Sequence, residues 1–348
     1  MAEAKPRTVG SAPSVDPVTM STVAAAASVS VPTVSKVLNK SSDVALETRT
    51  RVQSAIDELG YVRRPRLAKA APRVIDLVFT EFSPWAEEIL RGASEAALDA
   101  NRRSAVSALN SEEDVDRWLG TLTPSNTEGV IVVLAELTDR QAQRLRKTRI
   151  PVVAIDTEAI EDLEFLTIGS SNWAGGLAAT EHLRQLGHRR IATITGKPEL
   201  LLSQARLDGY RAALERAGVE IDADLIATGD FHYESALEAC LSLLSLPDPP
   251  TAIFAASDVT AMGVYEAARR FRLRIPDDLS VVGFDDVPMA KWMSPPLTTL
   301  RAPLAEMAAL AVRAVLDPGS FAFQHRLEFA TRLVVRSSTH PPNGGVTT

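Results

Sequence analysis

The sequence predicts an α/β protein that carries a small, all-helical head at its N-terminal end. Three observations lead to this prediction. From residue 73 onward, short apolar runs alternate with amphipathic stretches, a pattern typical of parallel sheets covered by helices. Before that point, three segments carry apolar residues at helical spacing. Charge is also uneven: residues 1–72 contain ten Lys/Arg and six Asp/Glu, a net +4, whereas the remainder carries −11, for a total of −7.

The composition excludes several classes of protein. The single cysteine, Cys240, excludes intramolecular disulfides and indicates a reducing compartment, so we predict a cytoplasmic protein. No run of about 18 apolar residues occurs, and we therefore predict no membrane span. Residues 1–17 are mixed and rich in Pro, Ser and Ala, which predicts a disordered tail and not a signal peptide. Residues 341–348 are predicted to form a second tail.

Residues 18–62 predict the helical head. Thr19 is a good N-cap for a first short helix, because its hydroxyl can accept a hydrogen bond from a free backbone N–H. Ser30 can cap a second helix over residues 31–39 in the same way. A third helix is predicted over residues 46–59, where apolar residues recur at a helical period. Two short helices joined by about three residues, followed by a longer one, form a helix-turn-helix unit.

The second predicted helix has the chemistry of a DNA-reading helix. Residues 18–39 contain no carboxylate that would repel phosphate. Lys36 can donate to guanine O6 and N7, and Val31 and Pro32 can contact base edges or thymine methyl groups. A basic head on an acidic body also indicates a polyanionic partner. The alternative is a small three-helix domain without a role in nucleic-acid binding.

Two segments, VTMSTVAAAASVSVPTVSKVLN and VALETRTRVQSAIDELGYV, resemble the N-terminal domain of the lactose-repressor (LacI/GalR-type) family. The resemblance implies base reading by Val31, Pro32 and Lys36. It places polar groups that contact phosphate or cap helices at five further positions: Thr19, Ser30, Thr33, Ser35 and Asn39. The sequence departs from the family at Thr22, where an acid is common. It also departs at Ser28, where glycine is usual, which predicts slight strain in the turn.

Residues 63–73 are predicted to be a hinge. The resemblance implies a short helix that becomes ordered on operator DNA and inserts a leucine into the minor groove. In this chain the link is about three residues shorter than in the archetype, and the leucine position falls near Ala70. The predicted DNA-contacting residues of the hinge are Arg63, Arg64, Arg66 and Leu67. The basic residues can track phosphate without a wedge, and a merely flexible linker is the alternative.

The body is predicted from short apolar strands at residues 74–79, 129–134, 151–155, 190–195, 251–257 and 279–286. About 270 residues are too many for one such sheet, so two lobes are expected. Ligands bind at the C-terminal ends of strands in open parallel sheets. Two facing lobes therefore predict a cleft that suits a small polar molecule and hinge closure.

The family resemblance extends over the body, in the segments GSSNWAGGLAATEHLRQLGHRRIA, ARLDGYRAAL, FAASDVTAMGV and SVVGFDDVPMAKWMSPPLTTLRAP. It implies a two-lobed, periplasmic-binding-protein-like (type I) effector domain over residues 74–340. Family topology implies three crossovers between the lobes, near Ile168–Ser171, Leu297–Arg301 and Asp317–Gln324. The first lobe would then comprise about 74–168 and 301–318, and the second about 169–297 and 323–340.

The resemblance places effector contacts at Thr80, Phe82, Trp85, Asp156, Ser170, Ser171, Arg206, Phe231, Ser257, Asp258 and Asp285. The planar fork of Arg206 can bridge two vicinal hydroxyls, and Asp156 and Asp285 can accept hydrogen bonds from hydroxyls. The apolar face of a sugar ring can be covered by one of three aromatic side chains: Phe231, Trp85 or Trp173. The alternatives are a surface salt bridge for Arg206 and a strand-end turn or helix cap for Asp285.

Taken together, the sequence predicts a DNA-binding transcriptional regulator, a repressor, controlled by a small molecule bound between two lobes. Two subunits would pair through their bodies, and their heads would read a pseudo-palindromic operator. A sugar is the expected effector and a nucleobase the alternative, although Val133, Ser257 and Ala302 depart from residues found in the family and predict fewer amides in the pocket.

The sequence predicts no metal, no cofactor and no catalytic set. The five histidines are scattered, without the spacing of metal ligands. Two rival classes remain for comparison. A solute-binding component of a transporter would need a signal peptide or lipid anchor and no basic helical head. An enzyme on the same scaffold would need a nucleophile–base pair or a metal set.

Overall fold

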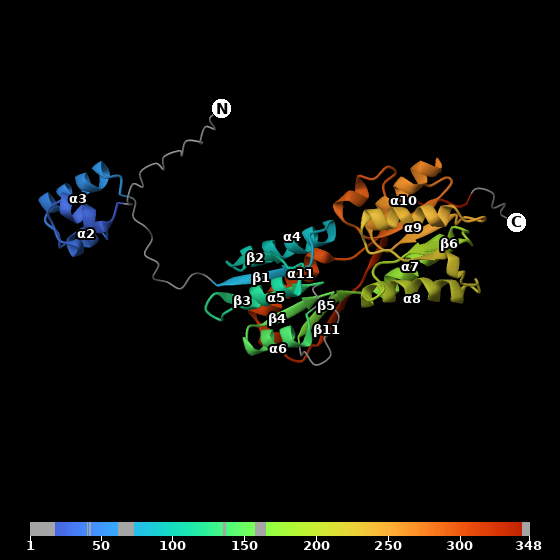
Figure 1. Cartoon of the computed structure of the whole chain (residues 1–348), viewed down its shortest axis with the longest axis horizontal. Helices are drawn as coiled ribbons and strands as arrows, with labels where there is room; N and C mark the ends of the chain where they lie inside the picture. The colour runs from blue at the N-terminus through green and yellow to red at the C-terminus, as the bar shows by residue number, and fades with distance from the viewer. Residues whose placement is uncertain are drawn as a thin grey trace, which may run out of the picture. The chain divides into compact units, whose positions relative to one another are not determined.

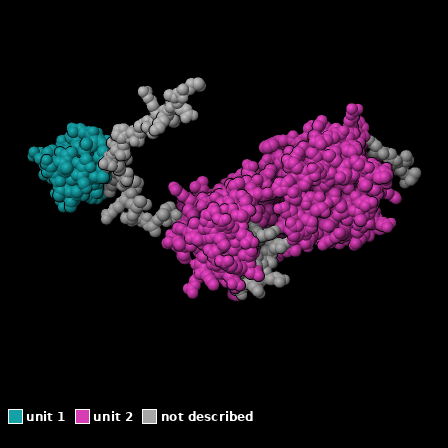
Figure 2. Space-filling model, viewed as in Figure 1, with its two compact units in different colours: residues 1–69 teal, residues 70–348 magenta. Residues whose placement is uncertain are grey.

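The structure is a computed structural model and describes residues 18–39, 41, 43–61, 73–134, 137–156 and 165–342. The chain divides into two compact units, residues 1–69 and 70–348, which we call the head and the body (Figure 2). Some predicted features lie outside the described residues: the tail 1–17, the hinge residues Arg63, Arg64, Arg66 and Leu67, and most of the second tail.

The head consists of three helices around a small apolar core. Its helices are α1 (Met20–Ala26), α2 (Val31–Leu38) and α3 (Leu46–Glu58). The Thr22 N–H donates to the Thr19 hydroxyl at 3.3 Å, and the Thr33 N–H donates to the Ser30 hydroxyl at 3.4 Å, so both caps form. The core side chains are Val23, Ala24, Ala27, Val34, Val37, Val52, Ala55 and Ile56. Ser28 has a φ of +54°, the left-handed backbone that glycine adopts with least strain.

The described helices show no single membrane-spanning candidate. Only α1 and α2 taken as a pair reach the length and apolar composition of a span, and they are bent by 103° at the break between them.

The first lobe of the body contains a six-stranded parallel sheet in the order β11-β5-β4-β3-β1-β2 (Figure 1). Its strands are β1 (Val74–Phe79), β2 (Arg103–Ala108), β3 (Thr127–Val133), β4 (Val152–Ile155), β5 (Leu166–Ser170) and β11 (Arg326–Phe329). Its helices are α4 (Pro84–Asp99), α5 (Glu112–Leu119), α6 (Asp139–Lys147) and α11 (Leu304–Leu316). Alternate side chains of the strands pack on α4 and α11 on one face and on α5 and α6 on the other.

The second lobe repeats this architecture with the sheet order β12-β10-β9-β8-β6-β7, in which only the β10–β12 pair of the described strands is antiparallel. Its strands are β6 (Ile191–Ile194), β7 (Ile226–Ala227), β8 (Ala252–Ala255), β9 (Ser280–Asp285), β10 (Thr298–Arg301) and β12 (Arg332–Val334). Its helices are α7 (Asn172–Gln185), α8 (Leu201–Arg216), α9 (Tyr233–Leu244) and α10 (Asp258–Phe271). Helices α7 and α8 cover one face, and α9 and α10 cover the other.

The chain crosses between the lobes three times, and two of these crossings differ from the sequence prediction. The first crossing follows β5. The second follows β10 at residues 302–303, because β10 (298–301) pairs with β9 in the second sheet. The third lies at residues 330–331, and the predicted position near Asp317–Gln324 is wrong. The reason is that β11 pairs in parallel with β5, so the chain remains in the first lobe until Phe329.

Candidate DNA interface and effector cleft

Helix α2 presents its predicted DNA-reading residues at the surface of the head. Val34 and Val37 are buried, and the 3.6-residue period therefore turns Val31, Pro32 and Lys36 outward. The other predicted DNA-contacting side chains are exposed or half-buried: Thr19, Ser30, Thr33, Ser35 and Asn39. This surface offers hydroxyls and one cation, and neither α1 nor α2 contributes a carboxylate to it.

Lys36 has a partner that the sequence analysis did not identify. Its Nζ lies 2.6 Å from Asp43 Oδ2, and the Ser41 hydroxyl also donates to the Asp43 carboxylate. These hydrogen bonds from Lys36 and Ser41 lower the pKa of Asp43 to about 2. Both side chains of the ion pair are about half exposed, at 55% and 54%, so water screens it. DNA can therefore displace Asp43 from Lys36 at little cost.

The body has two adjoining cavities between its lobes. The inner cavity is lined by Glu81, Ser83, Trp85, Leu134, Asp156, Leu202, Arg206, Phe231, Ser257, Val259, Asp285 and Val287. The outer cavity is lined by Asp156, Thr167, Gly169, Ser170, Ser171, Asn172, Trp173, Ala174, Leu200, Leu201, Leu202, Gln204, Ala205, Asp208, Arg326 and Glu328. Asp156 and Leu202 belong to both. The structure therefore brings most of the predicted effector contacts together, divided between two compartments.

Arg206 organises the inner cavity. Its Nε donates to Asn172 Oδ1 at 2.8 Å, and its Nη1 donates to the Ala256 carbonyl at 2.5 Å. Its Nη2 lies 3.5 Å from Asp285 Oδ1, and its guanidinium stacks 3.6 Å from the centre of the Phe284 ring. The side chain is 4% exposed, so the alternative of a surface salt bridge is wrong. Because several N–H groups of the guanidinium already bond to protein atoms, Arg206 mainly positions its neighbours and offers few free donors to a ligand.

Two carboxylate oxygens in this cavity lack a hydrogen bond. Asp156 Oδ2 and Asp285 Oδ1 are buried without a hydrogen-bond partner among the described residues, although Asp285 Oδ1 lies at ion-pair distance from Arg206. Burial raises the pKa of Asp156 to about 6 and that of Asp285 to about 7, and the charge of Arg206 opposes both shifts. An unpaired buried acceptor is costly, and a ligand that brings a donor removes that cost.

The backbone is strained at four residues that line the inner cavity. Leu134, Asp156, Phe231 and Asp285 have φ values of +49°, +46°, +73° and +108°. Such conformations cost free energy and concentrate at ligand sites. Gly196 makes room for the Phe231 ring, because a Cβ atom there would lie 1.9 Å from a ring carbon.

Three predicted effector contacts do not line either cavity. The Asp258 carboxylate is fully buried and accepts from the Val287 N–H at 2.9 Å and from the Thr299 hydroxyl at 2.6 Å. It supports the loop that follows β9 and has no free face. Thr80 is half-buried, and Phe82 is 64% exposed.

A contact between the two lobes lies beside the inner cavity, which Glu81 lines. His232 Nε2, from the second lobe, lies 3.0 Å from Glu81 Oε2 of the first lobe, and His232 Nδ1 lies 3.3 Å from Asp230. Partial burial opposes the charged form, but the two carboxylates raise the pKa of His232 above its ordinary value. The sequence analysis did not find this contact, because no local pattern pairs residues 151 positions apart.

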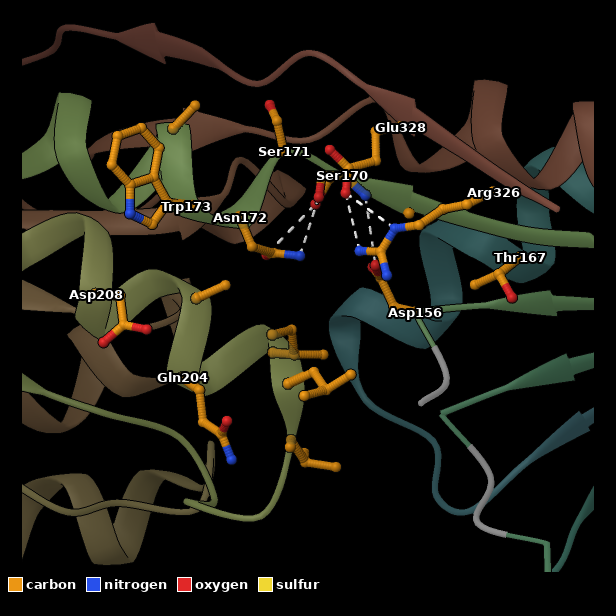
Figure 3. Close-up of a pocket in the computed structure, with 16 residues that line it drawn as sticks. Asp156, Thr167, Ser170, Ser171, Asn172, Trp173, Gln204, Asp208, Arg326 and Glu328 are labelled. Carbon is orange, nitrogen blue, oxygen red and sulfur yellow. Dashed lines mark hydrogen bonds and ion pairs between the residues drawn. The ribbon is translucent and has the colours of Figure 1, made fainter. Parts of the chain in front are cut away.

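The outer cavity combines predicted residues, among them Asp156 and Trp173, with side chains that the sequence analysis did not select: Gln204, Asp208, Arg326 and Glu328. Figure 3 shows Trp173, Gln204 and Asp208 on one side and Asp156, Arg326 and Glu328 on the other. The first group comes from α7 and α8 of the second lobe. In the second group, Asp156 directly follows β4, and Arg326 and Glu328 lie on β11 of the first lobe. The predicted residues Ser170 and Ser171 lie at the end of β5 beside them. The spacing of Gln204 and Asp208, four residues apart on α8, was the available signal.

Comparisons with known proteins fit both parts of the chain. The model of bacterial regulatory proteins of the lacI family matches residues 19–64, and that of the periplasmic binding protein-like domain matches residues 180–339. The transcriptional repressor CytR of Escherichia coli (strain K12) is 32% identical over 305 residues, which cover 86% of this chain and 89% of CytR.

Two solved structures share the architecture. A complex of the transcriptional regulator CelR with cellobiose is 33% identical, with a TM-score of 0.71 over 92% of this chain and 99% of that chain. The lac repressor dimer bound to operator and an anti-inducer is 27% identical, with a TM-score of 0.71 over 93% of this chain and 100% of that chain. With this identity and coverage, the chain belongs to the lacI family of bacterial regulatory proteins, and it is a transcriptional regulator with a DNA-binding head and a periplasmic-binding-protein-like body.

Proposed function

We propose that this protein is a cytoplasmic repressor that binds operator DNA as a homodimer. Its affinity for the operator rises or falls when a sugar binds between the lobes. The observation that carries the effector assignment is a pair of buried carboxylate oxygens in the inner cavity, Asp156 Oδ2 and Asp285 Oδ1. Neither accepts a hydrogen bond from the described residues, although Asp285 Oδ1 lies at ion-pair distance from Arg206. Sugar hydroxyls are donors that satisfy such acceptors, and Phe231 supplies an aromatic surface for the apolar face of a ring.

The charge of the cleft disfavours an acidic effector. Glu81, Asp156 and Asp285 line the inner cavity, where Arg206 is the only cation among the lining residues that the structure describes. An anionic ligand such as a sugar phosphate would be repelled by these carboxylates, whereas a neutral polyol would not. A nucleobase carries fewer donors than a sugar, so it satisfies fewer of the acceptors.

The homodimer is supported by exposed apolar side chains on one edge of the first lobe. Strand β2 is the edge strand of its sheet, and Val106 on that strand is 39% exposed. Leu98, at the end of the neighbouring helix α4, is 73% exposed. An unprotected edge with apolar side chains is a surface that associates. In the lac repressor structure, the related chain is a dimer on its operator.

Selection of binding sites from a random duplex library tests the DNA-binding part of this proposal. The full-length chain should return a pseudo-palindromic sequence that it binds at least about 10³-fold tighter than random duplex near 0.15 M salt. Return of a single, asymmetric half-site would contradict binding as a dimer. In that case, the substitution Val106→Asp on the exposed edge should leave the mass of the protein, measured by light scattering, unchanged.

The effector part is tested on the selected operator. Fluorescence anisotropy is measured with neutral sugars, sugar phosphates and nucleosides, and a neutral sugar should change operator affinity by about 5–150-fold. A response to sugar phosphates alone would contradict the charge argument. A response to nucleosides alone would replace the sugar by the alternative effector class.

A further inference from the structure

The outer cavity is larger than the inner one and defines the size of the ligand. Its volume is about 430 Å³, within the roughly 300–1,000 Å³ that small-molecule sites occupy. The inner cavity measures about 80 Å³, well below that range. As the lobes lie in this structure, the inner cavity cannot hold a complete sugar ring.

Helix α8 separates the two cavities and presents a different stripe to each. The stripe toward the outer cavity is Leu201, Gln204, Ala205 and Asp208, at helical positions i, i+3, i+4 and i+7. Arg206 faces the inner cavity, and Leu202 borders both, opposite Asp156 of the first lobe. A ligand that passes between Leu202 and Asp156 therefore reaches both compartments.

Each compartment has its own aromatic surface and its own acceptors. The outer cavity has Trp173, which is 42% exposed, together with the amide of Gln204 and the carboxylates of Asp208 and Glu328. The inner cavity has Phe231 and the two carboxylate oxygens without a hydrogen bond described above. An aromatic face combined with acceptors for hydroxyls is what one sugar ring requires, and the cleft provides this combination twice.

We propose that the effector consists of two linked sugar rings, one against Trp173 in the outer cavity and one against Phe231 in the inner cavity. Gln204, Asp208 and Glu328 determine specificity for the outer ring. This inference rests on the proposed function and specifies the ligand of the same cleft.

A two-ring ligand also explains how effector binding changes the arrangement of the two lobes. The inner cavity is too small for a ring in this arrangement of the lobes, so the inner ring enters only when the lobes move apart. The contact between Glu81, which lines that cavity, and His232 of the other lobe opposes this movement. The ligand therefore has different affinities for two lobe arrangements, as an allosteric effector must. A single ring in the outer cavity leaves the contact intact and produces no such difference.

Calorimetry on the full chain tests the size of the ligand. The probes are cellobiose, maltose, lactose and trehalose, with glucose and galactose as their component rings and cytidine as a nucleoside. At least one disaccharide should bind roughly 100-fold tighter than its component rings, and only disaccharides should change affinity for the selected operator. A monosaccharide that binds as tightly as every disaccharide, or cytidine that binds tighter than all sugars, overturns the inference. A one-ring effector that still shifts operator affinity leaves the proposed function standing.

Variants of the outer cavity test its assignment. Trp173→Ala and Asp208→Asn should each weaken the binding of the preferred disaccharide about tenfold. The matched controls are Phe323→Ala, an aromatic that is 94% exposed on the first lobe, and Glu215→Gln, an exposed carboxylate farther along α8. Both controls should bind the disaccharide like the unmodified chain. Unchanged disaccharide affinity in Trp173→Ala and Asp208→Asn overturns the inference.

Discussion

Lys36 in the head and Arg206 in the body are both cations singled out by sequence, yet they lie in opposite environments. Lys36 is 55% exposed and has one recorded acidic partner, Asp43. Arg206 is 4% exposed and is held by Asn172, a backbone carbonyl, Asp285 and an aromatic ring. The head therefore keeps its cation available for a partner that arrives, whereas the body uses its cation to build the site.

The difference in exposure between Lys36 and Arg206 corresponds to two different roles. A DNA backbone or base edge is a large external partner, and a screened ion pair gives way to it at small cost. A buried guanidinium cannot be released without leaving a carboxylate unpaired in a medium of low polarity. Arg206 thus fixes the Asp285 carboxylate, one of the two acceptors that the inner cavity offers to a ligand.

The largest expected effect comes from substituting the buried cation, Arg206. Arg206→Ala leaves Asp285 buried without its cation and should lower the free energy of unfolding by about 3–5 kcal/mol. Urea denaturation of the full chain, followed in the body, measures this change. The control Arg269→Ala removes an arginine that is 73% exposed and paired with Glu266, and should cost about 0–1 kcal/mol. Equal effects of the two substitutions would show that burial does not distinguish them.

The next effect concerns the exposed cation. Lys36→Ala should weaken binding to the selected operator by about 1–3 kcal/mol, because a base-reading hydrogen bond is lost. Binding to random duplex should fall much less, and the stability of the head should hardly change because the ion pair is exposed. An equal loss on operator and on random duplex would assign Lys36 to phosphate contact instead. Anisotropy titrations on both duplexes, at one salt concentration, decide between these roles.

The same contrast explains which features could be predicted from sequence. The head followed from local signals, because Thr19 and Ser30 are caps and the buried valines recur at a helical period. The central strands of the body followed from their continuous apolar runs. Strand β11 did not, because Arg326–Phe329 is a short edge strand whose side chains are half-buried or exposed and carry no apolar run. This omission also displaced the third crossover.

The site was predictable as a set of residues but not as a geometry. Arg206 was identified by its position, but the sequence could not show that Asn172 and Ala256 would use its donors, since these partners lie 34 and 50 residues away. Asp258 was expected to contact the effector, and only the fold shows its carboxylate bonded to Val287 and Thr299. The outer cavity depends on β11 and α8 meeting across the lobes, which no local pattern indicates.

A third prediction concerns pH and the two buried carboxylates of the inner cavity, Asp156 and Asp285. The pKa values of Asp156 and Asp285, about 6 and about 7, exceed the ordinary value of about 3.9, so the folded chain holds protons that the unfolded chain has released. From these two groups, the free energy of unfolding falls as pH rises from about 4 to 7, and their stabilising protons are absent above pH 7. A sugar that donates to the ionised carboxylates offsets this cost. Its shift of the melting temperature should therefore be larger at pH 8 than at pH 5, and Asp285→Asn should reduce the difference. A larger shift at pH 5 would contradict this prediction.

The smallest expected effect tests whether exposure or position in the fold sets the strength of an ion pair. The test is possible because the body also contains an exposed ion pair. Glu81 and His232 are 51% and 45% exposed, so their contact resembles the pair in the head although it lies at the effector cleft. Glu81→Gln should lower the free energy of unfolding by less than about 1 kcal/mol. The raised pKa of His232 means that its stabilising charge is present below about pH 6.5 and is lost as pH rises through the folded pKa, so the effect of Glu81→Gln should be visible at pH 5.5 and absent at pH 8.5. Because the substitution removes a contact that holds the lobes together, the preferred sugar should bind tighter in the variant at the lower pH. A loss of several kcal/mol would mean that location in the cleft, and not exposure, sets the strength of an ion pair in this protein.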